Sequence, residues 1–387
     1  MARSSLLKII YKIAFFLISL VSLLHGDFSE YLPWKTGTQL AKEEKEKFTE
    51  KPQQEILEKM EEAAEKTAVK EACDFKNLGA FSIADVFNAN AVANALSFSK
   101  KFIMNNDQCF THFNSAHDWN FWMNPYAFHA NYGGSKSDFS MTTGGVALGG
   151  EYNFFDCLIF GGELGYFHSN LSWEKSHGTA HINAVHFGPY LGYLFDHGYV
   201  AASFFWIRNF YGGELKICND EKKSINHYSW DGNLFLEGGY DIQLPMEISK
   251  DLHLYPFFKL HYTSISESAY EISKIKIKSR DSSYFSSYLA MKLAKTFMCG
   301  KSNVMIPGFI LGWIKLTPLS SEKLRAEGES DKPEKKNVKA KGLSQLLLGA
   351  EVPILHQTGF LIAVDYEAHI GSNASMQLGK IRLEWNW

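Results

Sequence analysis

The feature that most constrains this chain is the regular alternation of apolar with polar or small side chains from Trp119 to its last residue. In residues 345–354, for example, Leu346, Leu348 and Val352 share one face, because successive side chains of a strand point to opposite sides. The alternating segments are about twice as long as typical strands, which hold about 5–6 residues. Their second face is small and sparsely charged with both signs, as a water-filled or plugged lumen requires. The pattern predicts an all-β transmembrane barrel whose apolar face contacts lipid.

Turn residues divide this region into predicted strands. We expect twelve of them, over residues 119–132, 139–153, 156–172, 178–194, 197–212, 226–242, 252–266, 281–297, 302–316, 339–355, 358–370 and 374–387. Short turns, such as the one at 357–359, alternate with long polar connections at 213–227 and 317–337. Outer-membrane barrels have an even number of antiparallel strands, short periplasmic turns and longer outer loops. The sequence therefore predicts a 12-stranded antiparallel barrel with both ends on the periplasmic side.

The last strand carries a second signal. Its apolar face is formed by Gly379 and by four larger residues, Ile381, Leu383, Trp385 and Trp387. An aromatic last residue that is preceded by alternating apolar residues is the pattern that barrel-assembly machinery recognises on a final strand. We interpret these four larger residues as the assembly signal.

The residues before the barrel fall into three predicted regions. Residues 1–26 have a basic start and an apolar run too short to span a bilayer, which is typical of a signal peptide. Residues 27–80 are rich in Glu, Lys and Ala and predict a charged helical or disordered region without a core. Residues 81–118 predict a more apolar helix, over 81–102, and a linker to the barrel of residues 119–387.

Six stretches resemble the autotransporter β-domain family, in the order of that family. They are TTGGVALGGEYNF (142–154), IFGGELGYFHSNLSW (159–173), HFGPYLGYLF (186–195), FLEGGYDI (235–242), LYPFFKLHY (254–262) and the closing LGKIRLEWNW. The resemblance implies an outer-membrane translocator barrel with an α-helix in its pore, which secretes or displays what precedes it. A usual passenger is a long β-helix, whereas about 90 residues lie here between signal and barrel. Three F-x-x-N strings, at 87–90, 128–131 and 167–170, also resemble those of chlamydial polymorphic membrane proteins.

Charged residues on the second strand face are the candidate functional residues. Because side chains alternate between the two faces of a strand, eight charged residues should face the lumen and form a network that holds a plug. They are Glu237, Asp241, Lys292, Glu351, Asp365, Glu367, Lys380 and Arg382. Asn105 and Asn106 lie in the linker, where some autotransporters cut themselves, although a polar linker pair is the favoured interpretation. Asp196 and His197 resemble the paired groups of outer-membrane proteases, but they fall in a predicted periplasmic turn. We therefore predict no enzyme and no cofactor.

These observations predict a barrel in the bacterial outer membrane, with loops exposed at the surface, that translocates or displays a short N-terminal region. A porin-like channel and a loop-mediated adhesin remain the alternatives. The expected partners are outer-membrane lipid, the barrel-assembly machinery and, for an adhesin, a host or cell-surface ligand. The net charge of −3 gives no basic field, so nucleic acid is not expected.

Overall fold

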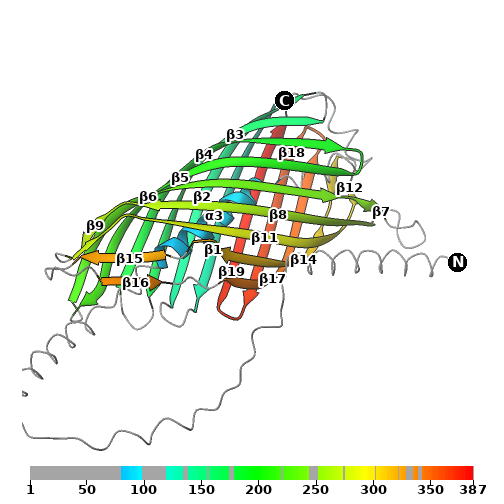
Figure 1. Ribbon diagram of the computed structural model, residues 1–387. Coiled ribbons are helices and arrows are strands. Elements are labelled where there is room, and N and C mark those ends of the chain that lie inside the picture. Colours follow the sequence, from blue (N-terminus) through cyan, green and yellow to red (C-terminus); the bar gives the residue numbers. More distant parts are fainter. Residues whose placement is uncertain are drawn as a thin grey trace, which may run out of the picture. The chain divides into compact units, whose positions relative to one another are not determined.

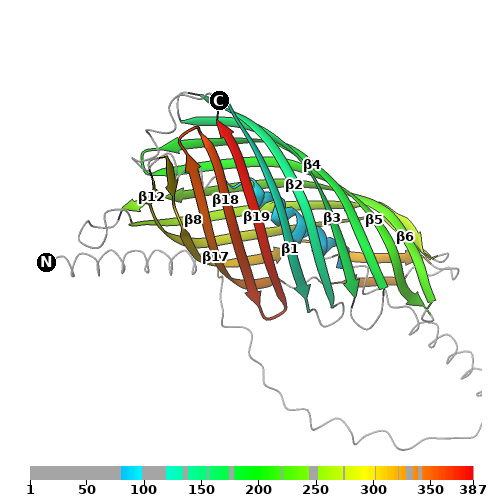
Figure 2. The ribbon, with the colours of Figure 1, turned by 180° about the vertical axis from the view of Figure 1, so that it is seen from behind.

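A computed structural model describes residues 80–97, 119–133, 138–154, 157–173, 178–218, 221–243, 252–272, 275–300, 302–320, 322–327, 334–338 and 342–386. Within this part of the chain, twelve antiparallel strands form a closed barrel, as Figures 1 and 2 show from opposite sides. The ring closes because the first wall strand pairs with the last, as Tyr126 pairs with Lys380. The predicted 12-stranded antiparallel barrel is confirmed.

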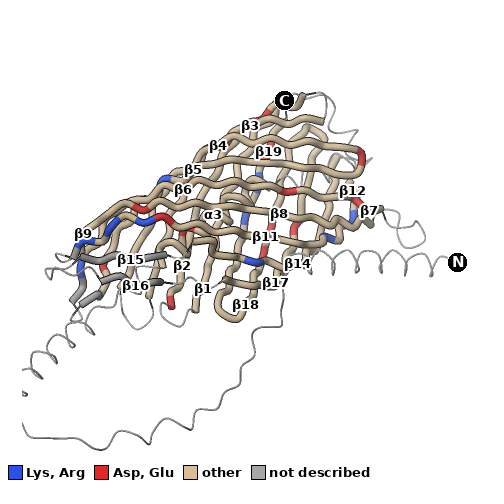
Figure 3. Tube along the Cα trace, in the orientation of Figure 1, with Lys and Arg blue, Asp and Glu red and all other residues tan. Residues whose placement is uncertain are grey.

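The wall strands follow one another in chain order. They are β1 (Trp119–Tyr132), β2 (Phe139–Phe154), β3 (Leu158–Trp173), β4 (Gly178–Phe195), β5 (Gly198–Cys218), β6 (Glu221–Tyr240), β8 (Leu252–Glu267), β11 (Arg280–Lys295), β14 (Gly308–Pro318), β17 (Leu343–His356), β18 (Phe360–Gly371) and β19 (Ala374–Asn386). Three short strands lengthen this sheet: β7 (Ile242–Gln243) pairs with β8, and β12 (Phe297–Cys299) pairs with β13 (Asn303–Met305), which pairs with β17. Figure 3 shows how sparsely charged residues are spaced along the wall, and β4 carries none.

Alternation along each strand separates two faces of the wall. In β4, Phe187, Leu191 and Tyr193 are exposed, whereas Ile182 and Tyr190 are buried. The exposed apolar side chains form the outer face, which suits lipid, and the buried face lines the inside of the barrel. Strand parity read from the sequence therefore assigns side chains to the correct side of the wall.

Glycines in β2 and β3 make room for large inward-facing rings. A Cβ at Gly149 would lie 2.2 Å from the ring of Trp122, and one at Gly161 would lie 2.4 Å from the ring of Tyr190. The Trp122 Nε1 donates a hydrogen bond of 2.8 Å to the Tyr190 hydroxyl, which links the two rings on the inner face of the wall. One glycine of each Gly-Gly pair in these strands, such as Gly149 or Gly161, is thus required by packing inside the barrel.

The two ends of the barrel differ in their connections. Wall strands β3, β5 and β18 follow short turns at one end, where the first residue of β1 and the last of β19 also lie. We call this end the periplasmic end, because short turns are typical of that side. Gly359 completes the β17–β18 turn with a φ of +80°, a conformation that glycine adopts without strain. We call the opposite end, with the longer connections, the outer end.

Three sequence predictions at the barrel ends were wrong. Residues 213–227 were expected to be a loop, but 213–218 belong to β5 and 221–227 to β6, with Gly213 paired to Ile225. The predicted strand 302–316 breaks before Gly308, because Pro307 has no N–H to donate to a ladder. The predicted connection 317–337 contains β15 (Glu322–Glu327) and most of β16 (Glu334–Val338). These two strands join β10 (Ile275–Ile277) and β9 (Tyr270–Ile272) in a separate sheet of order β16-β15-β10-β9.

One helix, α3 (Ala80–Ala95), lies inside the ring of strands, and all of its residues are buried. The sequence placed a helix over 81–102, and the observed helix ends earlier, with residues 98–102 outside the described part of the chain. Among the described residues, no helix is both long and apolar enough to span a membrane.

Candidate functional site

The interior of the barrel is the candidate site, because α3 occupies it. Small side chains keep the helix narrow, and its alanines are Ala80, Ala84, Ala89, Ala91, Ala93 and Ala95. An α-helix with average side chains is about 10–12 Å wide, so an alanine-rich one fits more easily within a small barrel. Polar side chains then connect the helix to the wall at three levels.

The middle of the helix is held by two asparagines. Asn88 Oδ1 accepts hydrogen bonds from Thr143 Oγ1 and from Ser169 Oγ, each of 3.1 Å. Asn90 Oδ1 lies 2.7 Å from Nδ1 of His261 on β8. Asparagine is unfavourable inside helices because its side chain competes for backbone groups. Here each amide oxygen has a partner on the wall, so these residues fix the rotation of the helix.

The C-terminal end of α3 is capped by the wall. The last carbonyl groups of a helix have no partner within the helix and attract amide and ammonium donors. Asn124 Nδ2 donates a hydrogen bond of 2.8 Å to the Ala95 carbonyl, and Lys380 Nζ lies 3.3 Å from the Asn94 carbonyl oxygen. Lys259 Nζ donates a hydrogen bond of 2.8 Å to Asn94 Oδ1. Two lysines from different strands therefore converge on one helix end.

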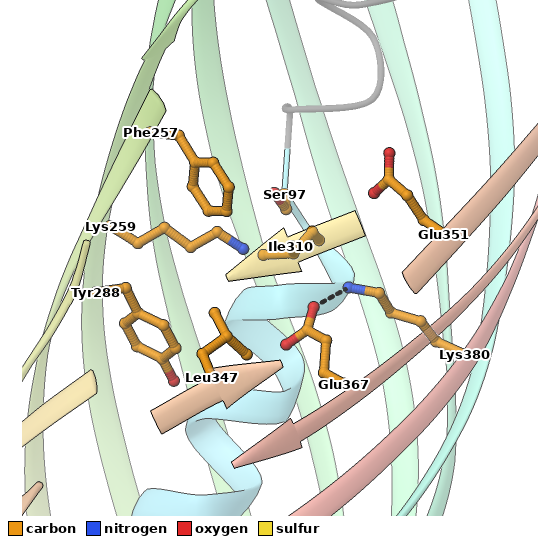
Figure 4. A pocket seen from close by; sticks show the side chains of 9 residues that line it. All are labelled: Ser97, Phe257, Lys259, Tyr288, Ile310, Leu347, Glu351, Glu367 and Lys380. Atoms are coloured by element: carbon orange, nitrogen blue, oxygen red, sulfur yellow. Dashed lines mark hydrogen bonds and ion pairs between the residues drawn. The ribbon is translucent and has the colours of Figure 1, made fainter. Parts of the chain in front are cut away.

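A small cavity lies beside this capped end. Figure 4 shows Lys259 and Lys380 pointing toward it from opposite sides, with Ser97 nearby. Glu367 Oε1 lies 3.3 Å from Lys380 Nζ, and Ser97 Oγ donates a hydrogen bond of 2.9 Å to Glu237 Oε2. Carboxylates thus lie near the ammonium groups where the chain leaves the helix. Opposite charges that are buried together in this way compensate one another in the absence of water.

The N-terminal end of α3 is held by a different set of residues. The ring of Phe81 packs edge-on against Trp173, Tyr211 and His227, with centroids 5.6, 5.1 and 5.2 Å away. Asp85 accepts a hydrogen bond from the Tyr211 hydroxyl. Trp173 is the last residue of β3 and thus lies at the outer end of the barrel. The helix therefore runs with its first residues toward the outer end and its last toward the periplasmic end.

The structure places all eight predicted lumen residues inside the barrel, each between 0% and 6% exposed. Glu237 and Lys380 contact the helix segment, through Ser97 and Asn94. Most of the others pair between strands: Lys292 with Glu351, Asp241 with His253 at 3.1 Å, and both Asp365 and Glu367 with Lys380 at 3.8 and 3.3 Å. Arg382 pairs with Glu384 on its own strand, at 2.8 Å. The network thus joins strands to one another more often than it joins the wall to the plug.

The predicted assembly signal is described in part. Ile381 and Trp385 are exposed on the outer face, and Leu383 is half-buried on the same face. Trp385 packs on the ring of Phe360, 5.2 Å away, and pairs with Phe121 across the closing seam. Trp387 and the linker residues Asn105 and Asn106 lie outside the described residues.

Sequence reasoning missed the residues that hold the helix most directly. Lys259 was recoverable, because the alternation of residues 254–262 places it on the same face as Phe257 and His261. Three asparagines in an alanine-rich helix, Asn88, Asn90 and Asn94, were also a signal, because such residues need partners. In the described part of the chain, no three His, Cys, Asp or Glu side chains lie close enough together to hold a metal ion.

Comparison with known proteins adds to this geometry. The family description "Autotransporter beta-domain" matches residues 121–366. Among solved structures, the translocator domain of the autotransporter NalP from Neisseria meningitidis is 12% identical, with a TM-score of 0.60, over 80% of this chain and 98% of that chain. The β-domain of the Bordetella autotransporter BrkA is 16% identical, with a TM-score of 0.59, over 70% of this chain and 100% of that chain. At these identities the likeness shows a common fold. No curated protein matches the sequence.

Proposed function

This chain belongs to the autotransporter β-domain family, and on that premise we propose that its barrel carries its own N-terminal region to the cell surface and holds it there. Family membership makes the chain an outer-membrane translocator barrel. What the barrel translocates or displays is the part that we infer. The proposed cargo is the short charged region before Ala80, and no catalytic role is included.

The direction of α3 is the observation that carries this proposal. Phe81 packs against Trp173 and His227 near the outer end, whereas Ser97 contacts Glu237 near the periplasmic end. Ala80, the first described residue of the helix, consequently lies toward the outer side of the pore. This position supports a route in which the region before Ala80 enters from the periplasm and passes through the barrel.

The contacts of the helix support retention rather than free passage. Each third of α3 makes polar contacts with wall residues, through Asp85, Asn88, Asn90 and Asn94. Hydrogen bonds to charged groups contribute about 1.5–3 kcal/mol each and neutral ones about 1 kcal/mol. Together these contacts favour a plug that stays in the pore, so an open porin-like channel is the weaker alternative.

An epitope tag inserted after residue 78 tests the proposal. We expect antibody to label intact cells that make the tagged full-length chain. A matched control carries the same tag in the periplasmic turn after Thr358, which should be labelled only after the outer membrane is permeabilised. Labelling of the residue 78 tag only in permeabilised cells would contradict the proposal.

A binding role for the outer end is the second candidate. The observation that favours it is the sheet β16-β15-β10-β9, because connections of this length are usually functional when they are ordered. Its ligand would be a host or cell-surface molecule. Replacing residues 322–338 with a short turn should then abolish adhesion of cells while the amount of folded barrel stays unchanged.

A further inference from the structure

The outer face of the wall changes character toward the outer end. On β3, the outward residues Phe160, Leu164 and Tyr166 are followed by His168 and Asn170. The same change from apolar to polar outward residues recurs on several strands: at His129 on β1, Asn183 on β4, Ser264 on β8 and Ser344 on β17. Transmembrane barrels have an apolar outward band flanked by aromatic residues at each interface. This boundary therefore marks the level of the lipid headgroups.

Arg208 lies on the outward face of β5 one ladder step inside this boundary, because it pairs with Val185 whereas Asn183 pairs with the next outward residue of β5, Phe210. It follows the outward residues Phe204 and Trp206, and its neighbours Ile207 and Asn209 are fully buried on the inward face. An arginine on a lipid-facing wall is costly unless its charge has a partner at the interface. Its position thus raises the question of what that partner is.

Three outward aromatic rings frame the Arg208 guanidinium. Its Cζ lies 3.9 Å from the ring centroid of Tyr228, 4.5 Å from that of Trp230 and 5.5 Å from that of Phe210. A planar guanidinium that stacks on aromatic rings is held in one orientation, and its N–H groups remain at its edge. The rings orient the charge but supply no anion.

The inward-facing cations provide a contrast. Lys292 pairs with Glu351, Lys380 with Glu367, and Arg382 with Glu384. Arg208 has no carboxylate within ion-pair distance among the residues that the structure describes. Nearby polar groups are neutral: Asn183 pairs with Phe210 across the ladder and lies diagonal to Arg208, and its Oδ1 is 2.8 Å from His168 Nδ1.

We propose that Arg208, framed by Tyr228 and Trp230, binds the phosphate group of a membrane lipid in the outer leaflet. The guanidinium edge matches two phosphate oxygens, and the two bonds formed are charge-assisted. The acyl chains of that lipid would lie along the apolar outward residues below the boundary, such as Trp206 and Phe187, whose rings stack with centroids 5.4 Å apart. The barrel thus carries a specific lipid site on β5 and β6, apart from the plugged pore.

The test uses the full chain folded in nanodiscs that contain phosphatidylcholine and a minor fraction of phosphatidic acid. Native mass spectrometry of the released barrel counts the phosphatidic acid molecules that remain bound. A cation near a membrane surface contributes about 1 kcal/mol to anionic lipid binding, so Arg208→Gln should lower retention about fivefold. Arg208→Lys keeps the charge but lacks the planar guanidinium, so its phosphatidic acid retention should lie between that of the unmodified chain and that of Arg208→Gln.

The matched control is Lys315→Gln. Lys315 on β14 is half-buried, pairs with Ser287 and Ser344, and has no aromatic ring against its ammonium group in the described part of the chain. Lys315→Gln should retain phosphatidic acid as the unmodified chain does. Unchanged retention in Arg208→Gln, or an equal loss in both variants, would overturn the proposal.

Two further arms complete the experiment. If Arg208→Gln fails to fold, Trp230→Leu decides, because it keeps an apolar outward residue but removes a ring that orients the guanidinium. It should lower retention, and unchanged retention would overturn the proposal. Inorganic phosphate added at millimolar concentration should not displace the lipid, whereas full displacement would show a free-anion site and contradict a lipid site.

Discussion

Replacing Leu164 with Arg should destabilise the folded barrel strongly. Leu164 is 59% exposed on the outward face of β3, where it pairs with Leu148 on β2 and with Phe187 on β4. Both partners are themselves exposed and apolar. Neither ladder partner therefore offers a polar group to a charge at this position.

The size of the effect follows from depth in the membrane. An Arg at the midplane of a barrel's lipid face costs about 2–4 kcal/mol, and one near the interface costs about 0–1 kcal/mol. Asn170→Arg provides the matched control, because Asn170 lies on the same strand and the same face but beyond the polar boundary at His168. A difference of about 3 kcal/mol between the two variants corresponds to a change of about 10²-fold in the folding equilibrium.

Urea unfolding of the barrel in phosphatidylcholine vesicles measures this difference. The folded fraction is read from the gel migration of unheated samples, and the free energy of unfolding is obtained by extrapolation to zero urea. We expect Asn170→Arg to stay within about 1 kcal/mol of the unmodified chain. Equal losses in both variants would refute the assignment of the outward face and of its polar boundary.

Three further predictions concern the interior and the final strand. Lys292→Met should lower the free energy of unfolding in urea by about 3–5 kcal/mol, because it leaves Glu351 buried without its partner. The double variant Lys292→Met, Glu351→Leu should recover most of that loss, and no recovery would count against the ion pair. Deleting residues 80–97 should raise the conductance of the barrel in planar bilayers, because α3 fills the pore, and unchanged conductance would show that it does not block ions. Trp387→Ser should lower the amount of folded barrel in outer membranes more than Asn386→Ser does, and equal amounts would argue against the assembly signal.

The barrel wall could be predicted from the sequence because each of its side chains faces either lipid or the lumen. Side chains alternate with a period of two, so one correct assignment, such as Leu348 outward, fixes the facing of Gln345 and Glu351. The charges that parity places inside the barrel include Lys292 and Lys380. The family resemblance added the helix in the pore, which alternation alone does not predict.

Other features could not be predicted, because they depend on contacts between distant segments. The alternation does not show which wall residues meet α3: Asn88 is separated in sequence from Ser169, and Asn94 from Lys259. Residues 213–227 were interpreted as a loop because many of them are polar, although 213–218 and 221–227 extend β5 and β6, with Leu215 and Ile225 buried on the inward face. The pairing of β10 with β15 likewise joins two connections that lie far apart in the sequence.

The chlamydial resemblance, the linker site at Asn105 and Asn106, and the barrel-assembly partner stay predictions. The linker site lies outside the described part of the chain, the barrel-assembly partner is a separate molecule, and the chlamydial resemblance depends on three short sequence strings. The absence of enzyme activity also stays a prediction.

The central claim is that the chain's own helix occupies the pore with its first residues toward the outer end. The most direct measurement is crosslinking between Asn88→Cys and Ser169→Cys in a full-length chain whose five native cysteines are replaced by Ser, because Asn88 Oδ1 and Ser169 Oγ are 3.1 Å apart. The matched control pairs Asn88→Cys with Asn170→Cys, which faces outward on the same strand. In isolated outer membranes, a short thiol crosslinker should join the Ser169 pair and leave the Asn170 pair separate. Equal crosslinking of both pairs, or none in the Ser169 pair of a folded barrel, would contradict the claim.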